Sequence, residues 1–323
     1  MTKRALITGV AGQDGTYLSE LLLSKGYEVF GVVGPYPGDF YERAARHGGR
    51  LQALEADLTD MASLLVAVET AQPDEVYNFA AQSSVGDSWG DALATTDINA
   101  VGVLRLLEAV RAVSPSARLF QASSADMFGN ADESPQRETT PLRPESPYAV
   151  AKAYGFHIVA AYRKSYGLHA SNGIMFNHES PLRGTNFVTR KITEGVARIK
   201  LGLASELRLG NLDARRDWGF AGDYVEAMWL MLQQDRPDDY VVASGETHTV
   251  REFCEAAFSH VGLGYSDHVV VDPAFLRPTD VSVQWGDASK ARTALGWSPK
   301  VAFPELVAMM VDADLERLRQ AED

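Results

Sequence analysis

Short apolar runs alternate with helix-like spacing of apolar residues over the first 180 residues of this chain. The run Ala5–Ile7 is followed by apolar positions from Tyr17 to Leu22 at helical spacing, and Gly26 ends this predicted helix. The same alternation predicts strands over Glu28–Val33, Glu75–Ala80, Arg118–Ala122 and Ala170–Phe176, and helices over Val101–Val113 and Ala149–Tyr166. Strands that alternate with helices indicate βαβ units and therefore a parallel sheet.

The pattern is less regular after about Asn177. Helices are predicted over Phe187–Leu201 and Asp223–Gln233, and strands over Glu206–Leu209 and Tyr240–Ala243. The helix Asp223–Gln233 and the strand Tyr240–Ala243 are expected to belong to the sheet domain again. The segments from Val250 onward would build a smaller lobe.

A glycine-rich turn stands directly between the first predicted strand and the first predicted helix. Its spacing is Gly9-x-x-Gly12-x-x-Gly15. Glycines at this position allow a tight turn and a close approach of a pyrophosphate, which then rests on the helix N-terminus. The alternative is a loop that merely needs glycine, but the strand–turn–helix context favours a dinucleotide site.

The expected fold class is therefore α/β: a doubly wound parallel sheet of the Rossmann type with a smaller, interleaved C-terminal substrate lobe. Residues 1–176 with about 220–245 would form the dinucleotide-binding domain. Residues from about 177–219 with 246–323 would form the lobe, and the ligand site should lie in the cleft between the two.

Charge and composition narrow the classes of partner. The 323 residues include 30 Lys and Arg against 43 Asp and Glu, a formal net charge of −13. This balance argues against nucleic acid and against a polybasic membrane anchor. No apolar run reaches the ~18–20 residues that span a bilayer. The N-terminal segment also lacks the apolar core of a signal peptide, and Cys254 is the single cysteine, so we expect a cytoplasmic protein.

Histidine and cysteine spacing gives no metal-site signal. The seven histidines form no His-x-x-x-His or Cys–His cluster, so we expect no metal. The charged C-terminal stretch Asp312–Asp323 is expected to be a solvated helix end.

Two further segments fit the adenosine half of a dinucleotide. Asp57-Leu58 follows the apolar stretch Leu51–Ala56, and Asn78–Gln82 follows the fourth strand. The second strand lacks its usual acidic end, because Pro35–Gly38 brings neither an acid for a ribose hydroxyl nor an arginine for a 2′-phosphate. These residues leave NAD and NADP open.

Tyr148 and Lys152 stand four residues apart on one predicted helix. A phenol with a pKa near 10 is a poor base at neutral pH, and a neighbouring ammonium favours the phenolate. Such a pair can take a proton from a sugar hydroxyl while hydride leaves the carbon. A surface helix pair is the alternative, but Ser123-Ser124 at a strand end fits the same site.

Longer strings of residues resemble a known family. These are Tyr77-Asn78, Ala81–Ser83, Gly173–Pro181, Phe187–Lys191, Gly210–Gly219 and Arg277–Thr279. The chain is similar to extended short-chain dehydrogenases/reductases, and most similar to the GDP-mannose 4,6-dehydratases, over nearly its whole length.

The resemblance implies a set of site residues. The catalytic residues would be Ser124, Asp126, Tyr148 and Lys152. A tightly bound NAD(P) would contact Gly9, Gly12, Gln13, Asp14, Gly15, Asp57, Leu58, Phe79, Ala80, Ala81, Gln82, Tyr148, Lys152, His178 and Arg183. The nucleotide-diphosphate sugar, with GDP-mannose favoured, would contact Ser83, Ser84, Asn177, Val188, Lys191, Asn211, Arg216, Arg277 and Asp280. Arg216 and Arg277 suit a diphosphate because guanidinium binds oxygens in pairs; surface charge is the alternative.

The resemblance also implies a reaction. Oxidation at C4 of the sugar acidifies the C5 proton, a carboxylate removes that proton, and water leaves from C6. The stored hydride then returns to C6, which gives a 4-keto-6-deoxy sugar.

Three departures from the family pattern matter. Asp126 replaces a glutamate and is one methylene shorter, and a displacement of ~1 Å can cost about 100-fold in rate. Pro35–Gly38 replaces Arg-Arg-Ser-Ser, which favours NAD over the family's NADP and a homodimer over a tetramer, although Arg43 or Arg46 could restore NADP binding. Asp280 is shorter than the family's glutamate in a ribose-binding motif.

Two other functions compete with the dehydratase. If Asp126 fails to reach C5 and C6, a nucleotide-sugar 4-epimerase or another oxidoreductase would remain. A non-catalytic NAD(P)-binding sensor would have no need for Tyr148 and Lys152.

Overall fold

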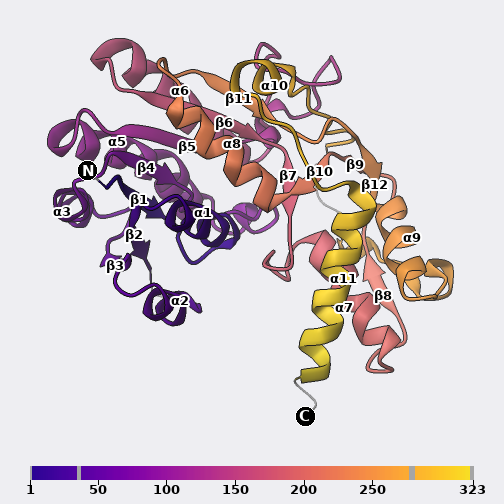
Figure 1. The fold of residues 1–323 in the computed structure, drawn as a ribbon. Helices are drawn as coiled ribbons and strands as arrows, with labels where there is room; N and C mark the ends of the chain where they lie inside the picture. The colour runs from indigo at the N-terminus through magenta and orange to yellow at the C-terminus, as the bar shows by residue number, and fades with distance from the viewer. Residues whose placement is uncertain (1, 35–37, 276–280, 321–323) are drawn as a thin grey trace.

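A parallel sheet forms the larger part of the molecule (Figure 1). The computed structural model describes residues 2–34, 38–275 and 281–320. Within them the sheet has seven strands in the order β11-β6-β5-β4-β1-β2-β3. The strands are β1 (Arg4–Thr8), β2 (Glu28–Val33), β3 (Leu51–Glu55), β4 (Glu75–Asn78), β5 (Arg118–Ser124), β6 (Ala170–Met175) and β11 (Asp239–Val242). The predicted fold class is confirmed.

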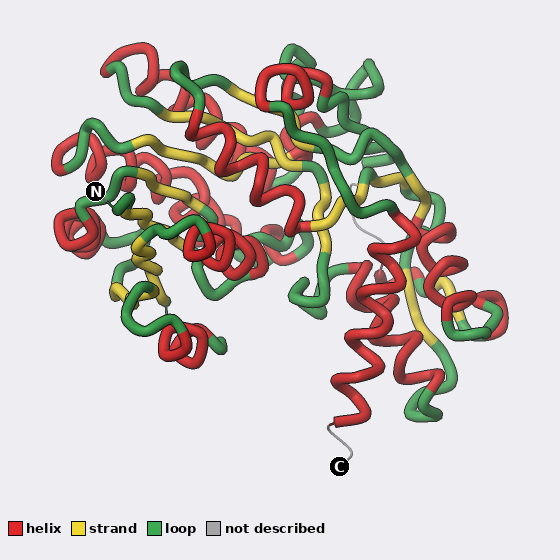
Figure 2. Tube along the Cα trace, viewed as in Figure 1, coloured by secondary structure: helices red, strands yellow, loops and turns green. Residues whose placement is uncertain are grey.

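Helices cover both faces of the sheet, as the strand sequences require. Along β1, Ala5 and Ile7 join one apolar core while Leu6 joins another, because successive side chains point to opposite faces. The first core is completed by α1 (Gln13–Ser24), α2 (Phe40–Arg46), α8 (Ala221–Gln233) and α10 (Ser289–Leu295). The second is completed by α3 (Met61–Ala71), α5 (Gly102–Val113) and α6 (Pro147–Tyr166). Figure 2 shows this layering.

A second group of elements forms a smaller lobe with its own apolar core. The helices are α7 (Val188–Lys200), α9 (Val250–His260) and α11 (Phe303–Gln320), whose apolar faces meet around Phe253 and Phe303. Short strands pair between them: β8 (Leu207–Leu209) with β13 (Val269–Val271), and β9 (Arg215–Arg216) with β12 (His248–Thr249). Between sheet and lobe, β7 (Asn177–Glu179) pairs with β10 (Trp218–Phe220).

A buried ion pair joins α7 to α11. Asp314 is 2% exposed, its carboxylate lies 2.7 Å from Nη2 of Arg190, and it also accepts a 2.7 Å hydrogen bond from Thr193. The expectation that the whole stretch from Asp312 is a solvated helix end is therefore wrong at Asp314. The charge is tolerated in the interior because Arg190 and Thr193 compensate for its lost hydration.

Helix α3 has no counterpart among the predicted elements. Asp60 caps it by accepting a 2.9 Å hydrogen bond from Ala62 N, and Leu64, Ala67, Val68 and Ala71 are buried at helical spacing. Helices α2 and α10 and the short strand β7 were likewise not predicted. The strands and helices that were predicted differ from the observed bounds by one to a few residues, as is usual where ends fray.

Candidate active site

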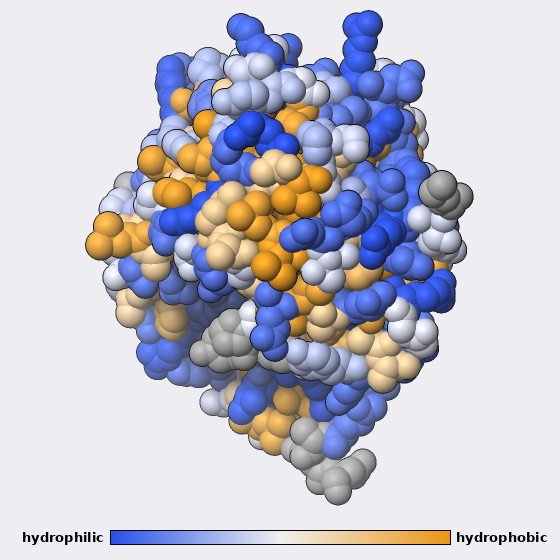
Figure 3. All heavy atoms as spheres, turned by 90° about the vertical axis from the view of Figure 1, so that its left-hand side faces the viewer, coloured by the Kyte–Doolittle hydropathy of each residue, from blue (hydrophilic) through white to orange (hydrophobic). Residues whose placement is uncertain are grey.

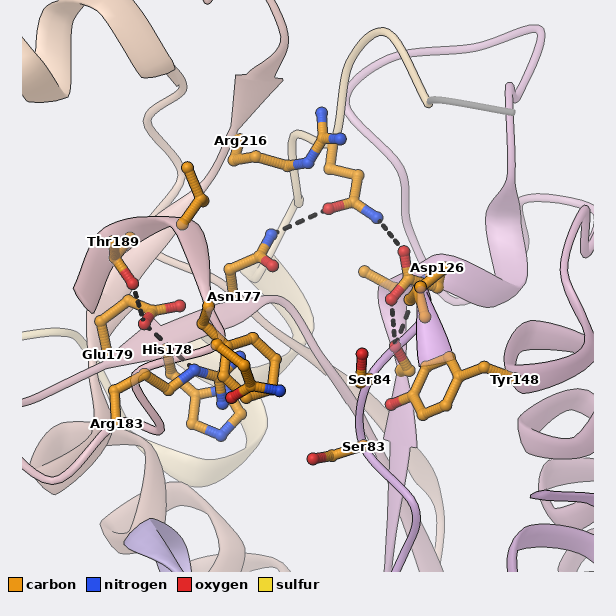
Figure 4. A pocket seen from close by; sticks show the side chains of 18 of the residues that line it. Ser83, Ser84, Asp126, Tyr148, Asn177, His178, Glu179, Arg183, Thr189 and Arg216 are labelled. Atoms are coloured by element: carbon orange, nitrogen blue, oxygen red, sulfur yellow. Dashed lines mark hydrogen bonds and ion pairs between the residues drawn. The ribbon is translucent and has the colours of Figure 1, made fainter. Parts of the chain in front are cut away.

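One cavity of about 680 Å³ lies between the carboxyl edge of the sheet and the smaller lobe. Parallel strands end at the same edge, so the segments that follow β1, β4, β5 and β6 meet there. The predicted site residues that line this cavity are Asp14, Phe79, Ala81, Ser83, Ser84, Ser124, Asp126, Tyr148, Lys152, Asn177, His178, Arg183, Val188, Lys191, Asn211 and Arg216. Figure 4 shows several of them from close by.

The glycine turn has the geometry that a bound pyrophosphate requires. Gly9 has φ +68°, and a Cβ there would lie 2.8 Å from Ala80 N. A Cβ on Gly15 would lie only 2.4 Å from the carbonyl oxygen of Gly9, so the helix starts in contact with the turn. No side chain caps α1, which leaves the N–H groups of its first turn for an anion. These residues fit a dinucleotide.

Beside the turn, Asp14 and His178 form a buried pair. His178 Nε2 lies 2.9 Å from Asp14 Oδ2, Nδ1 lies 2.7 Å from the carbonyl of Phe176, and the ring stacks on Tyr224. Burial lowers the pKa of His178, but the Asp14 carboxylate outweighs this and raises the pKa above its usual value. Burial raises the pKa of Asp14, and His178 outweighs this and lowers it. The pair therefore favours a cationic His178 next to the turn.

Arg183 extends this group toward the lobe. Its guanidinium lies 3.6 Å from the ring centroid of Phe187 and its Nε lies 3.2 Å from the Glu179 carboxylate. Glu179 also accepts a 2.6 Å hydrogen bond from Thr189. Glu179, Phe187 and Thr189 line the cavity. They lie in the strings Gly173–Pro181 and Phe187–Lys191 that carry the family resemblance, but sequence reasoning did not select them as site residues.

Tyr148 and Lys152 lie on the first two turns of α6 and are 8% and 7% exposed. Lys152 Nζ donates a 3.0 Å hydrogen bond to the carbonyl of Ala122. Burial lowers the pKa of Lys152 to about 8. Burial and the charge of Asp126 raise the pKa of Tyr148, while Ser124 and Arg183 lower it in part. Lys152 is not among the groups that lower this pKa, so the phenol favours its protonated form at neutral pH.

Asp126 is held by hydrogen bonds to two neighbours, Ser124 and Gln284. It lies in a single 3₁₀ turn, Ala125–Phe128, directly after β5, and its N–H donates to Ser124 Oγ at 3.2 Å. Ser124 Oγ in turn lies 3.2 Å from Oδ2, and Gln284 Nε2 donates to Oδ1 at 2.8 Å. Gln284 Oε1 accepts from Asn177 Nδ2 at 2.8 Å, and Figure 4 draws this chain as dashed lines.

Gln284 was missed by sequence reasoning. It is a single glutamine in a segment without periodic pattern, and it lies close to the Arg277–Thr279 string. The signal that identifies it is structural, because a glutamine only 4% exposed needs partners for both amide atoms.

The substrate side of the cavity is formed by the lobe. Lys191 Nζ lies 4.9 Å from the ring centroid of Phe275, and Val188 begins α7. Arg216 Nη1 donates to the carbonyl oxygens of Arg215 and Val281 at 2.9 and 2.7 Å, which fixes the base of its guanidinium. Arg208 also lines the cavity, although sequence reasoning did not select it. The predicted contacts Arg277 and Asp280 lie outside the described residues.

The other predicted cofactor residues do not line the cavity but follow β1, β3 and β4. They are Gly9, Gly12, Gln13, Gly15, Asp57, Leu58, Ala80 and Gln82. Asp57 Oδ1 accepts two hydrogen bonds from Thr59, and Leu58 packs beside Gly102. Gln82 Oε1 is buried and has no hydrogen-bond partner among the described residues, so it is an acceptor available for a ligand hydroxyl.

Arg43 was one of two arginines expected to restore 2′-phosphate binding. Its three nitrogens donate to Asp39 Oδ1, Ser19 Oγ and the carbonyl of Val10, each at 3.0–3.1 Å. The side chain is 3% exposed and therefore supports the glycine turn from behind. Pro35–Pro37, on which the cofactor preference depends, lie outside the described residues.

Neither a membrane-spanning helix nor a cluster of metal-binding side chains occurs among the described residues. None of their helices combines the length and apolar character needed to cross a bilayer. No three of their His, Cys, Asp or Glu side chains converge as a metal site would require.

Comparisons with known proteins identify close relatives of this chain. The family model described as GDP-mannose 4,6 dehydratase matches residues 6–310. GDP-mannose 4,6 dehydratase 1 of Arabidopsis thaliana is 53% identical, and the match covers 97% of this chain and 90% of the plant protein. GDP-mannose 4,6 dehydratase of Homo sapiens is 48% identical over 98% of this chain and 92% of its own length.

Solved structures with the same fold are more distant in sequence. DesIV, a dTDP-glucose 4,6-dehydratase from Streptomyces venezuelae with NAD and TYD bound, is 26% identical with a TM-score of 0.87, covering 98% of both chains. RMD from Pseudomonas aeruginosa, complexed with NADPH, is 24% identical with a TM-score of 0.82, covering 98% of this chain and 100% of its own.

Proposed function

The chain belongs to the GDP-mannose 4,6-dehydratase family, and on this premise we propose that its cleft converts GDP-mannose to the 4-keto-6-deoxy sugar. It is a lyase that uses a nicotinamide cofactor without net redox change. One observation carries the assignment: a carboxylate, Asp126, lines the same cavity as Tyr148 and Lys152 and lies 3.2 Å from Ser124. A 4-epimerase needs the tyrosine and the serine but has no step for that carboxylate, so epimerisation is not favoured.

The proposed roles follow from the positions of the side chains. When bound in this cavity, a nicotinamide would supply the hydride acceptor for C4 of the hexose and the hydride donor for C6. Tyr148 Oη takes the proton of the C4 hydroxyl after its own proton has left to solvent, and Ser124 and Arg183 help by lowering the pKa of this buried phenol. Lys152, charged below about pH 8, keeps a cation next to the phenolate form of Tyr148 that accepts this proton.

Asp126 performs the elimination. Its carboxylate takes the C5 proton once C4 is a ketone, and the electron pair of the C5–H bond forms the C5–C6 double bond as the C6–O bond breaks. The same carboxyl then gives the proton to the departing C6 oxygen, which leaves as water. Because one group receives and returns the proton, its position relative to both C5 and O6 controls the rate.

The remaining contacts are assigned to substrate and cofactor by their place in the cavity. Lys191, Asn211 and Arg216 face the space that the nucleotide diphosphate would fill, and the two cations Lys191 and Arg216 offset the net charge of −13 locally. Asp14, His178, Arg183 and the glycine turn would hold the nicotinamide dinucleotide. The two domains, residues 1–176 with 220–245 and 177–219 with 246–323, would enclose both ligands.

We infer that the cofactor is NAD rather than NADP. Arg43 already uses its three nitrogens in bonds beneath the glycine turn, so a 2′-phosphate would have to break them to gain this cation. Mass spectrometry of the nucleotide released by denaturation distinguishes NAD from NADP.

A homodimer in the cytoplasm is the proposed assembly. Leu93 on the short helix α4 (Ala92–Thr96) is 87% exposed, and Val150 and Tyr154 on the neighbouring α6 are 54% and 41% exposed. Apolar side chains exposed on adjacent helices indicate an interface. Figure 3 shows that apolar side chains also gather in a band on one side of the sheet domain. Light scattering of the wild type and of Leu93→Asp tests for a dimer, a tetramer or a monomer.

The central test uses GDP-mannose in deuterium oxide with NMR detection of the sugar. A 4-keto-6-deoxy product with deuterium at C5 supports the proposal, and an epimer that keeps its C6 oxygen overturns it. Asp126→Asn is the matched variant because it keeps the shape of the side chain and removes the base. It should retain oxidation at C4 and lose the release of water.

A further inference from the structure

The backbone around Gln284 is fixed from two sides. Gln284 N donates to the carbonyl of Arg215 on β9 at 3.0 Å. The next residue, Trp285, exchanges hydrogen bonds with Gln136: its N donates to Gln136 Oε1 at 2.9 Å, and its carbonyl accepts from Gln136 N at 2.7 Å. The segment is therefore a rigid support for the glutamine side chain.

The amide of Gln284 has only one orientation that satisfies both of its neighbours. Nε2 must face the carboxylate of Asp126, which only accepts, and Oε1 must face the Nδ2 of Asn177, which only donates. A flipped amide would place oxygen against oxygen and nitrogen against nitrogen. Since Gln284 is 4% exposed, no water shell would compensate for either loss.

We propose that Gln284 is a positioning residue for the elimination: it keeps Oδ1 of Asp126 as a permanent acceptor and so makes Oδ2 the oxygen that carries the substrate proton. The inference rests on the proposed dehydratase function and deepens it. A proton on Oδ1 would face the Gln284 N–H, donor against donor. A proton on Oδ2 faces Ser124, whose hydroxyl can either donate or accept.

The surroundings of Asp126 explain why such a tether is needed. Arg216 of β9 and Glu145 of the loop before α6 line a small cavity with Asp126. The charge of Asp126 also acts to raise the pKa of Tyr148 and of Lys152 on α6. A carboxylate released by Gln284 could turn toward the Arg216 guanidinium and away from C5 and O6. The 2.8 Å hydrogen bond from Gln284 opposes this rotation. The contact of the short Asp126 side chain with Ser124 is longer, at 3.2 Å, and restrains the carboxylate less.

The chain of bonds also crosses the cleft. Asn177 lies on β7 and Asp126 follows β5, so Gln284 joins a predicted sugar contact to the acid–base group. A substrate that binds Asn177 would therefore also orient the carboxylate of Asp126, through Gln284.

The test compares Gln284→Leu with the wild type. We expect kcat to fall roughly 10- to 100-fold, the cost of a displacement near 1 Å, with KM within about 3-fold. Because oxidation at C4 does not involve Asp126, the reduced cofactor should accumulate in the steady state and be visible by its near-ultraviolet absorbance. Wild-type kcat, or a loss without accumulated reduced cofactor, overturns the proposal.

A second variant, Gln284→Glu, supplies a pH signature. As a carboxylate the new side chain repels Asp126 and removes the donor, so the loss should exceed that of Gln284→Leu at pH 8. On acidification towards about pH 5, the introduced carboxyl group becomes protonated and donates again, so the activity of this variant relative to wild type should rise. A ratio that is independent of pH contradicts the proposal.

Gln136→Leu is the control for a merely structural effect, since it loosens the same segment through Trp285 and leaves the Asp126 contact in place. Because the Gln284–Asp126 bond remains, reduced cofactor should accumulate less than in Gln284→Leu and the pH signature should be absent; an equal accumulation, or the pH signature, in this variant overturns the proposal. Thermal unfolding of each variant checks that it folds. If the wild type forms no 4-keto-6-deoxy product, the proposed function fails, whereas a wild-type-like Gln284→Leu defeats this inference alone.

Discussion

The two sides of the cavity hold their reactive groups in different ways. Tyr148 and Lys152 share one helix, and burial within the sheet domain fixes both. Asp126 is instead held by Gln284, 158 residues further along the chain, which is itself bonded to Asn177, 107 residues away from it. A group fixed by its own helix depends on local structure, whereas a group held by distant side chains depends on how sheet and lobe pack. The two groups should therefore respond differently to substitution.

The largest expected effect comes from removing the helical group. Tyr148→Phe should lower kcat roughly 10³-fold because the proton acceptor for the C4 hydroxyl is lost, while the fold and cofactor binding are retained. NMR of the product measures this loss. Tyr166→Phe, at the exposed end of the same helix, is the matched control and should behave as the wild type. A loss under 10-fold in Tyr148→Phe would assign the proton transfer to another group.

The second largest effect is expected from a substitution in the glycine turn, whose geometry is determined by local sequence. In Gly15→Ala the new Cβ would lie 2.4 Å from Gly9 O and 2.5 Å from Val10 Cα, so turn and helix must separate. We expect cofactor affinity to fall by about 100-fold or more, with a stability loss of about 1–3 kcal/mol. Calorimetric titration with NAD measures the affinity. In the control Gly12→Ala the new Cβ would lie 3.3 Å from Gly9 O, so the loss of stability should be much smaller.

Asp126→Glu tests the tethered side directly. The added methylene moves the carboxylate by about 1.5 Å, although Gln284 Nε2 already lies 2.8 Å from Oδ1. We expect kcat to fall about 10- to 100-fold instead of rising, because this site is built around the shorter acid. Adding Gln284→Asn, which shortens the amide by one methylene, should recover part of the rate. A faster Asp126→Glu enzyme would show that the short arm is a handicap.

The smallest effect concerns the buried amine on the helix. Burial lowers the pKa of Lys152 to about 8, so above this pH the unfolded chain binds more protons than the folded chain. Stability from this group therefore rises with pH, by about 1.5 kcal/mol between about pH 8 and 9.5. The wild type should gain this amount relative to Lys152→Met in denaturant unfolding. An unchanged difference across this window would mean that Lys152 titrates normally.

Prediction from the sequence succeeded for features that neighbouring residues determine and failed for features that depend on distant residues. The strand Glu28–Val33 and the glycine turn were predicted at their observed positions, because apolar periodicity and a turn that only glycine tolerates are local properties. Helix α3 was not predicted, since Met61–Ala71 is apolar enough to mask its helical period. The solvated interpretation of Asp314 failed because its partner Arg190 stands 124 residues earlier.

The sequence by itself therefore determined the parallel sheet, the dinucleotide turn, the Tyr148–Lys152 pair and, through long strings of residues, the family. Each of these is encoded in neighbouring residues, so backbone geometry alone brings its members together. Only the tertiary structure decided that Gln284 holds Asp126, that Arg43 supports the turn from behind, and that Arg190 and Asp314 lock the lobe. These contacts join buried polar atoms from distant segments. Which atoms need a partner becomes apparent only after the core has removed their water.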